Sequence, residues 1–160
     1  MDHMTEIRPL EKDDALDDLI TLSREFFYEY EGHHGDYFKI DSLEDDHIIR
    51  YFTSFWEHET RKAYIAIIDG KIVGYITIYI KEQADYWQVK KVGEISGLMV
   101  KKEFRRLGIA SELMKKAEVF FQANALKYFT VYSAVNNREA IDFYKKCGLH
   151  PLYMTLVGEV

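Results

Sequence analysis

Cysteine is almost absent from this sequence, because Cys147 is its only example. An internal disulfide is therefore excluded, and such sparse use of cysteine favours a reducing compartment such as the cytoplasm. No apolar run approaches the roughly 20 residues that a membrane-spanning helix needs. Charged residues interrupt the N-terminus, which does not resemble a secretory signal peptide. We expect a cytoplasmic protein that has no membrane partner.

An excess of positive charge is also missing. The 21 Lys and Arg residues are outnumbered by 27 Asp and Glu residues, for a net charge of -6. This balance argues against a nucleic-acid-binding protein, which would show a basic field. It favours a cationic partner, although ordinary solubility charge explains it as well. The adjacent His33 and His34 lack the spaced Cys, Asp or Glu residues of a metal site, so we expect no metal.

The length and the 48% hydrophobic content predict one globular domain over residues 1–160. Apolar periodicity predicts a mixed α/β (α+β) fold. Asp69-Gly70 predicts a tight hairpin turn, and Gly148 a helix C-terminus. The predicted strands are 5–8, 63–68, 71–80, 89–100, 128–135 and 152–157, and the predicted helices are 13–30, one from Ser42, 106–125 and 137–147.

Three helix starts are predicted from capping residues. Asp13 or Asp14 would cap the first helix, and Ser42 would begin the second. Asn136 with Glu139 would cap the last helix, which leaves Asn137 free for a ligand.

The stretch from Glu94 to Ala110 carries the chemistry. A strand with an acidic residue runs into the turn Arg105-Arg-Leu-Gly-Ile-Ala110, where a helix begins. Backbone N–H groups at a helix N-terminus, with two arginines beside them, suit a phosphate group. Gly108 has no Cβ that would block the approach of a ligand. A phosphorylated carrier next to a carboxylate base suggests an enzyme.

Two motifs here resemble the GNAT superfamily of N-acetyltransferases. Arg105-Arg-Leu-Gly108-Ile-Ala110 is similar to its Arg/Gln-x-x-Gly-x-Gly/Ala turn. The segment from Asn137 to Leu149 matches its Asn-x-x-Ala-x-x-Phe-Tyr-x-x-x-Gly-Phe pattern except that Leu149 replaces the last aromatic residue. The resemblance implies a GNAT fold, in which helices flank a mixed central sheet and a β-bulge near Gly97 splays the two central strands. It covers residues 63–157, the acyl-CoA core, and leaves residues 1–62 as the acceptor side.

The resemblance implies acetyl-CoA as cosubstrate. The turn would hold the pyrophosphate, and the strand at Leu98-Met99-Val100 would bind the pantetheine arm, with the Met99 N–H polarising the thioester carbonyl. The implied cofactor-binding residues are Leu98, Met99, Val100, Arg105, Arg106, Leu107, Gly108, Ile109, Ala110, Asn137 and Tyr144.

Two side chains are candidates for proton transfer. Glu94, eleven positions before Arg105, would deprotonate an amine directly or through water. Tyr144 would protonate the departing thiolate, as the resemblance implies. Glu94 could instead be a surface residue paired with Lys90 or Lys91, and Tyr144 a core aromatic residue. Glu82 and Asp85 are alternative bases.

The expected reaction is direct attack of a primary amine on acetyl-CoA in a ternary complex. The acidic residues Glu25, Glu29, Glu31 and Asp36 favour a small cationic amine, although a solvated helix face explains them too. A protein or peptide amino group, or a non-catalytic acyl-CoA sensor, is the alternative. A homodimer is expected only by analogy with this fold.

Overall fold

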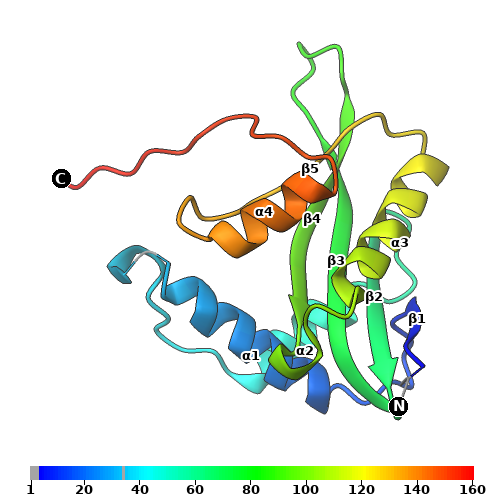
Figure 1. The fold of residues 1–160 in the computed structure, drawn as a ribbon. Helices are drawn as coiled ribbons and strands as arrows, with labels where there is room; N and C mark the ends of the chain where they lie inside the picture. The colour runs from blue at the N-terminus through cyan, green and yellow to red at the C-terminus, as the bar shows by residue number, and fades with distance from the viewer. Residues whose placement is uncertain (1–3, 34) are drawn as a thin grey trace.

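The structure is a computed structural model and describes residues 4–33 and 35–160. Two helices follow the first strand, three consecutive strands come next, and a helix, a strand and a last helix end the described order, with two short 3-10 helices between elements (Figure 1). The elements are β1 (Glu6–Pro9), α1 (Asp17–Glu31), η1 (Gly35–Phe38), α2 (Asp45–Thr53), β2 (Arg61–Ile68), β3 (Lys71–Glu82), β4 (Lys91–Val100), η2 (Lys102–Phe104), α3 (Ile109–Ala123), β5 (Phe129–Val131) and α4 (Arg138–Lys146).

One five-stranded sheet, in the order β1-β2-β3-β4-β5, organises the fold. The first four strands are antiparallel neighbours, and β5 lies parallel to β4 after the α3 crossover. Asp69 and Gly70 join β2 to β3 with φ angles of 51° and 76°. Two successive positive φ angles match the right-handed twist of a hairpin, so the predicted turn is confirmed. The mixed α/β fold class is confirmed as well.

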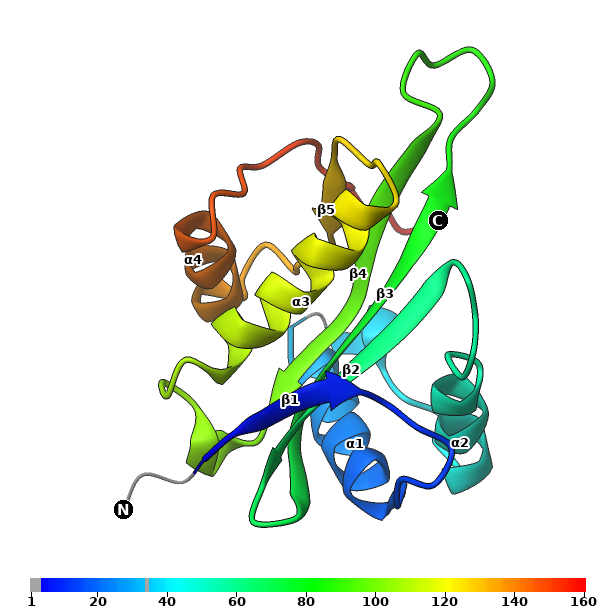
Figure 2. The ribbon, with the colours of Figure 1, turned by 90° about the vertical axis from the view of Figure 1, so that its right-hand side faces the viewer.

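The two faces of the sheet are covered by different helices, with α1 and α2 on one face and α3 and α4 on the other (Figure 2). Alternating strand residues therefore feed two separate cores. Ile95 and Val100 pack with α3, whereas Tyr75 and Met99 pack with α1 and α2. Apolar burial on both faces holds the sheet as a rigid middle layer.

Gly93 allows α3 to lie close against β4. A Cβ atom at this position would stand 2.4 Å from the Phe121 ring, well inside van der Waals contact. Because successive residues of a strand point to opposite faces, the next residue, Glu94, points away from α3 and toward α1 and α2.

A β-bulge interrupts the pairing of β3 with β4 next to Gly97, as predicted. Thr77 pairs with Gly97 and Ile78 with Ile95, so Ser96 is the extra residue. Pairing between β4 and β5 ends at the same level, where Ile95 lies opposite Val131. Beyond the bulge, residues 97–100 keep β3 as a partner and separate from β5. A bulge bends its strand, which explains the separation.

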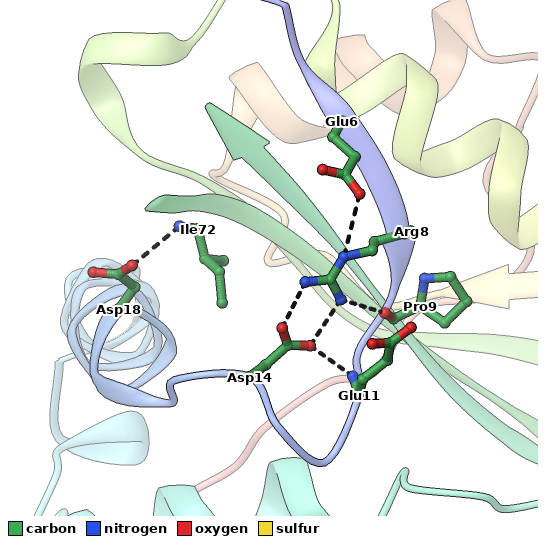
Figure 3. A network of polar contacts seen from close by, with 7 residues as sticks. All are labelled: Glu6, Arg8, Pro9, Glu11, Asp14, Asp18 and Ile72. Atoms are coloured by element: carbon green, nitrogen blue, oxygen red, sulfur yellow. Dashed lines mark hydrogen bonds and ion pairs between the residues drawn. The ribbon is translucent and has the colours of Figure 1, made fainter. Parts of the chain in front are cut away.

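A polar network fixes the chain before α1 (Figure 3). Arg8 donates two hydrogen bonds to Asp14, at 2.9 and 2.6 Å, and Asp14 also accepts from the Glu11 N–H at 2.7 Å. Asp18 accepts from the Ile72 N–H at 3.0 Å and so ties α1 to β3. The prediction that Asp13 or Asp14 caps α1 is wrong, because Leu16 occupies the N-cap and Asp14 is held by Arg8.

Three further elements differ from the predictions. Ser42 does not begin the second helix; α2 starts at Asp45 after the N-cap Glu44. The predicted strand 152–157 is not formed, because this segment is exposed and pairs with no strand among the described residues. β5 is also shorter than the predicted 128–135.

Candidate active site

The turn before α3 has the backbone shape of an anion cradle. Arg106 and Gly108 have φ angles of 63° and 83°, in the left-handed region. Gly108 is the N-cap of α3, and no side chain caps the N–H groups that follow it. The N–H groups of Ile109 and Ala110 at the start of this helix therefore carry the positive end of the helix dipole. The sequence placed the helix start at Arg106, three residues too early, because the left-handed residues extend the turn.

The Arg105 side chain ties this turn to α1. Its Nε donates to the Val100 carbonyl at 2.8 Å, and its Nη2 lies 3.1 Å from Glu29 Oε1. Nη2 also lies 3.4 Å from the Met99 sulfur. Lys102 adds a weaker ion pair with Glu29 at 3.9 Å. Arg105 thus stabilises the turn through these contacts. Arg106 has no comparable hydrogen bond or ion pair among the described residues.

The acidic cluster of α1 is partly used inside the molecule. Glu29 pairs with Arg105, and Glu31 accepts a hydrogen bond from the Ile40 N–H at 2.9 Å. These two carboxylates stabilise the fold, so they add little to the attraction of a cationic acceptor. Glu25 and Asp36 have no such ion pair among the described residues.

The strand segment Leu98-Met99-Val100 lies where β4 has left β5. It pairs with β3 through Ile76, Tyr75 and Gly74, and it has no partner strand on its other side among the described residues. Val100 belongs to the core under α3 and Leu98 packs against it, as expected of core side chains. The backbone of this segment, rather than its side chains, is therefore available on the open side.

Glu94 is the buried carboxylate of the site, with 2% of its surface exposed. It faces α1 and α2, directly opposite Tyr79 on β3. Burial, together with the closeness of this carboxylate, raises the pKa of Tyr79 well above its ordinary value. The Lys81 Nζ lies 3.8 Å from Glu94 Oε2, which has no hydrogen-bond partner among the described residues.

The three carboxylates considered as the base differ in where they lie. Glu94 is not a surface residue, and its ion-pair partner is Lys81 rather than Lys90 or Lys91. Glu82 and Asp85 are exposed at the distal end of the β3–β4 hairpin. Glu94 is therefore the candidate base best separated from water.

Three hydroxyl groups lie together at the bulge and were not predicted from the sequence. Tyr51 of α2 lies 2.8 Å from the Thr77 hydroxyl and 3.0 Å from the Ser96 hydroxyl, and the last two are 2.8 Å apart. Thr77 is fully buried, whereas Tyr51 and Ser96 are exposed. This triad ties α2 to the bulge two residues after Glu94. The strand register across the β3–β4 connection was needed to find it.

Tyr144 and Asn137 lie on α4. Tyr144 and Phe143 pack against the core under α3, and burial raises the pKa of Tyr144 to about 12. The phenol therefore keeps its proton at physiological pH, as a general acid requires. Tyr144 remains partly exposed.

The prediction that Asn136 and Glu139 cap α4 is wrong. Asn137 is the N-cap, and its side-chain oxygen accepts from the Ala140 N–H at 3.3 Å. The Asn136 side chain donates instead to the His33 carbonyl at 2.6 Å, which joins this loop to the end of α1. Only the side-chain NH₂ of Asn137 remains for a ligand. His33 is half-buried beside Tyr30, and His34 lies outside the described residues.

Over residues 4–33 and 35–160, no group of three or more His, Cys, Asp or Glu side chains is arranged to hold a metal ion. In the same part of the chain, none of the helices combines the length and the apolar character needed to cross a membrane.

Known relatives are found among acetyltransferases. An uncharacterised N-acetyltransferase of Methanocaldococcus jannaschii is 28% identical over 142 residues, 89% of this chain and 59% of the relative. A second from the same organism is 36% identical over 95 residues, 59% of this chain and 56% of the relative. An N-alpha-acetyltransferase of Caenorhabditis elegans is 32% identical over 77 residues, 48% of this chain and 41% of the relative. The chain thus spans about three fifths or less of these relatives' lengths.

Solved structures share the fold at low identity. A Bacillus halodurans protein has a TM-score of 0.83 at 19% identity, over 97% of this chain and 99% of the other. The aminoglycoside acetyltransferase AAC(6')-Iy, in complex with a bisubstrate analogue of CoA and acetylneamine, has a TM-score of 0.78 at 14% identity, over 98% of both chains. The aminoglycoside 6'-N-acetyltransferase AAC(6')-Ih of Acinetobacter baumannii has a TM-score of 0.76 at 19% identity, also over 98% of both. Residues 16–149 match the acetyltransferase (GNAT) family, and the chain belongs to that family.

Proposed function

We propose that this protein transfers the acetyl group of acetyl-CoA to a primary amine. The observation that carries this proposal is the buried Glu94 beside the bulge, on the same strand that leads to the left-handed turn before α3. A proton acceptor and an anion cradle are thus joined by a strand segment with an open backbone edge.

Binding of the cosubstrate would use the turn and the open strand. The N–H groups from Arg106 to Ala110 hold the pyrophosphate, and the segment Leu98-Met99-Val100 pairs with the pantetheine arm as an added strand would. The Met99 N–H polarises the thioester carbonyl. Family relationship supports this arrangement, as does the AAC(6')-Iy structure, whose bound analogue contains CoA.

The amine must lose a proton before it attacks. A primary amine has a pKa near 10, so it arrives mostly protonated at neutral pH. Glu94 accepts the proton, either directly or through water and the adjacent Tyr79. The amine nitrogen then forms a bond with the acetyl carbon, and the carbonyl electrons move to oxygen. Holding the two reactants in line supplies much of the acceleration.

Collapse of the tetrahedral intermediate breaks the carbon–sulfur bond. The sulfur leaves with the electron pair, the Tyr144 phenol donates a proton or a hydrogen bond to it, and the nitrogen releases its second proton to water to give the neutral amide. In this scheme residues 63–157 form the acyl-CoA core and residues 1–62 shape the acceptor side, although segment 152–157 lies outside the packed body. No covalent enzyme intermediate is involved, and Cys147 has no catalytic role.

A small cationic amine is the acceptor that we favour. Several neighbours of this fold are aminoglycoside acetyltransferases, and their substrates carry several amino groups. The half-buried Glu25 and the exposed Asp36 leave some negative charge near the acceptor side. A protein or peptide amino group is the second candidate, favoured by the N-alpha-acetyltransferase relative. A cytoplasmic location remains an expectation from the single cysteine.

Thiol release from acetyl-CoA, measured against a panel of amines, tests this function. We expect turnover with polyamines or aminoglycosides and less with peptides bearing a free N-terminus. Calorimetric titration with CoA separates the rival functions. Binding of CoA without turnover on any amine would indicate an acyl-CoA sensor, and absence of binding would indicate an interaction domain.

A further inference from the structure

The hydroxyl triad of Tyr51, Thr77 and Ser96 lies on the same face of the sheet as Glu94. Tyr79 follows Thr77 by two residues on β3, so both side chains point toward α1 and α2. Tyr79 is also the cross-strand partner of Glu94. The bulge turns Ser96 to this face as well, because its hydroxyl lies 2.8 Å from the Thr77 hydroxyl. The triad and the buried carboxylate are therefore neighbours along one face.

Gly97 leaves the space in which the triad forms. A Cβ atom at this position would stand 3.0 Å from Thr77 Oγ1, the oxygen that contacts both other hydroxyls of the triad. Thr77 is fully buried, and a buried hydroxyl needs hydrogen-bond partners. Tyr51 and Ser96 are exposed, so these two oxygens also face the acceptor side.

The hydrogens of the triad are all used inside it. The three hydroxyl oxygens make three mutual contacts of 2.8 to 3.0 Å, and Ser96 Oγ also donates to the Thr77 carbonyl at 3.1 Å. Each hydroxyl supplies one hydrogen, so these four contacts already exceed the three hydrogens present. If Tyr51 turned its hydrogen outward, two of the short contacts would have none. The exposed oxygens of Tyr51 and Ser96 therefore present lone pairs, and no hydrogen, to a ligand.

Glu94 adds a third oxygen of the same kind. Its side chain is buried, and its Oε2 has no hydrogen-bond partner among the described residues. Lys81, the cation 3.8 Å from this oxygen, lies two residues beyond Tyr79 on β3, on the side away from the triad. Burial raises the pKa of Tyr79 above its ordinary value, and the nearby Glu94 carboxylate and Tyr51 phenol add to this rise. Tyr79 is thus close to both parts of the site.

We propose that the oxygens of Tyr51 and Ser96, together with the Glu94 carboxylate, bind the ammonium group of a primary amine. A primary ammonium carries three N–H donors, which is one for each of these oxygens. A tertiary ammonium has the same charge but a single N–H, which the carboxylate takes because hydrogen bonds between charged groups are the stronger ones. The site therefore selects primary amines. This inference rests on the proposed acetyl transfer and gives Tyr51 a role in binding the acceptor, without a part in proton transfer.

Tyr51→Phe tests the proposal by calorimetric titration of the CoA-saturated chain with two dications, 1,4-diaminobutane and its N,N,N′,N′-tetramethyl derivative. The variant keeps the ring contacts with Phe52 and Phe55 and removes only the oxygen. We expect the dissociation constant of 1,4-diaminobutane to rise about tenfold and that of the tetramethyl derivative to change less than about twofold. In turnover, KM for the diamine should rise about tenfold with kcat within about a factor of two. Tyr86→Phe is the matched control, at an 81% exposed tyrosine on the β3–β4 connection, and should leave both constants unchanged.

Three results would overturn the proposal. Equal weakening of both amines in Tyr51→Phe would mean that the triad only holds α2 in place. Unchanged affinity for 1,4-diaminobutane in the variant would place the ammonium group elsewhere. Absence of diamine binding to the wild type would leave the site without its ligand. Acetyl transfer fails separately: diamine binding that depends on Tyr51, with no acetylation of any amine, would refute the proposed function and support the ammonium site.

Discussion

Tyr79 and Glu94 lie directly opposite each other on β3 and β4, and the Glu94 carboxylate is almost fully buried at this pair. Glu94 Oε2 has no hydrogen-bond partner among the described residues, and the Lys81 Nζ lies 3.8 Å from it, too far for a hydrogen bond. A buried carboxylate with an unused oxygen is costly to keep, and we propose that this oxygen accepts a proton from a ligand.

Replacement of Glu94 tests this role. Glu94→Gln should lower kcat about a hundredfold at neutral pH, because the amide cannot accept the ammonium proton. The deficit should be largest at low pH, where the acceptor is fully protonated, and should narrow as pH approaches the amine pKa. The measurement is the pH profile of kcat/KM for both proteins. A constant ratio across pH would remove Glu94 as the base.

Glu82→Gln is the control for this experiment. Glu82 is an exposed carboxylate at the end of β3, so its replacement makes the same chemical change away from the site. We expect its pH profile to match that of the wild type. A similar loss in both variants would point to a general charge effect.

Tyr144→Phe should reduce kcat by about a hundredfold while the affinity for CoA stays within a factor of two or so. Phenylalanine keeps the ring packed against the core and removes only the hydroxyl. Because burial raises the pKa of Tyr144 to about 12, the acid stays protonated and should impose no alkaline decline in rate below about pH 11. Tyr86→Phe, at an 81% exposed tyrosine, is the control. Unchanged kcat in Tyr144→Phe would exclude the phenol as the proton donor.

The turn before α3 can be tested through its backbone. Gly108 has a φ of 83°, so Gly108→Ala should strain the turn by about 1–2 kcal/mol and raise the dissociation constant of CoA about tenfold. Calorimetric titration measures this change. Gly70→Ala is a matched control, because Gly70 has a φ of 76° and open space around it, at a hairpin away from the turn. Gly70→Ala should lower the melting temperature without changing the dissociation constant of CoA. Equal affinity in all three proteins would place the pyrophosphate elsewhere.

Asp14 should make stability depend on pH. Its hydrogen bonds to Arg8 hold its pKa below the ordinary value of 3.8. Its contribution to stability is therefore complete above that value and is lost as pH falls through the lower, folded-state pKa. Asp14→Asn should reduce the free energy of unfolding by about 1–2 kcal/mol at pH 7 and flatten the acid decline. Urea unfolding between pH 2 and 7 measures both effects. An unaltered acid decline in the variant would assign it to other carboxylates.

The sequence predicted those features that depend on local chemistry. Asp69-Gly70 predicted the hairpin between β2 and β3, Gly148 predicted the end of α4, and the turn that contains Gly108 predicted a strand-to-helix junction. It failed where one residue had two competing partners. Asp14 could cap α1 or pair with Arg8, and the strong bidentate ion pair prevailed. Asn136 and Asn137 competed for the α4 cap in the same way.

The pairing register of β3 with β4 could not be predicted from the sequence. The positions of Tyr79, Thr77 and Tyr51 around Glu94 and Ser96 depend on the β3–β4 pairing and on a bulge that shifts it by one residue. Nothing in the connecting loop specifies that shift. The segment 152–157 has the composition of a strand, but it pairs with no strand among the described residues.

The central claim is that the acetyl group moves to an amine nitrogen held beside Glu94. Mass spectrometry of a small polyamine after incubation with acetyl-CoA and the full chain measures this most directly. We expect one acetyl group on the amine for each CoA thiol released, with the yield falling steeply in Glu94→Gln. Thiol release without an acetylated amine, or no product with any amine of the panel, would contradict the account.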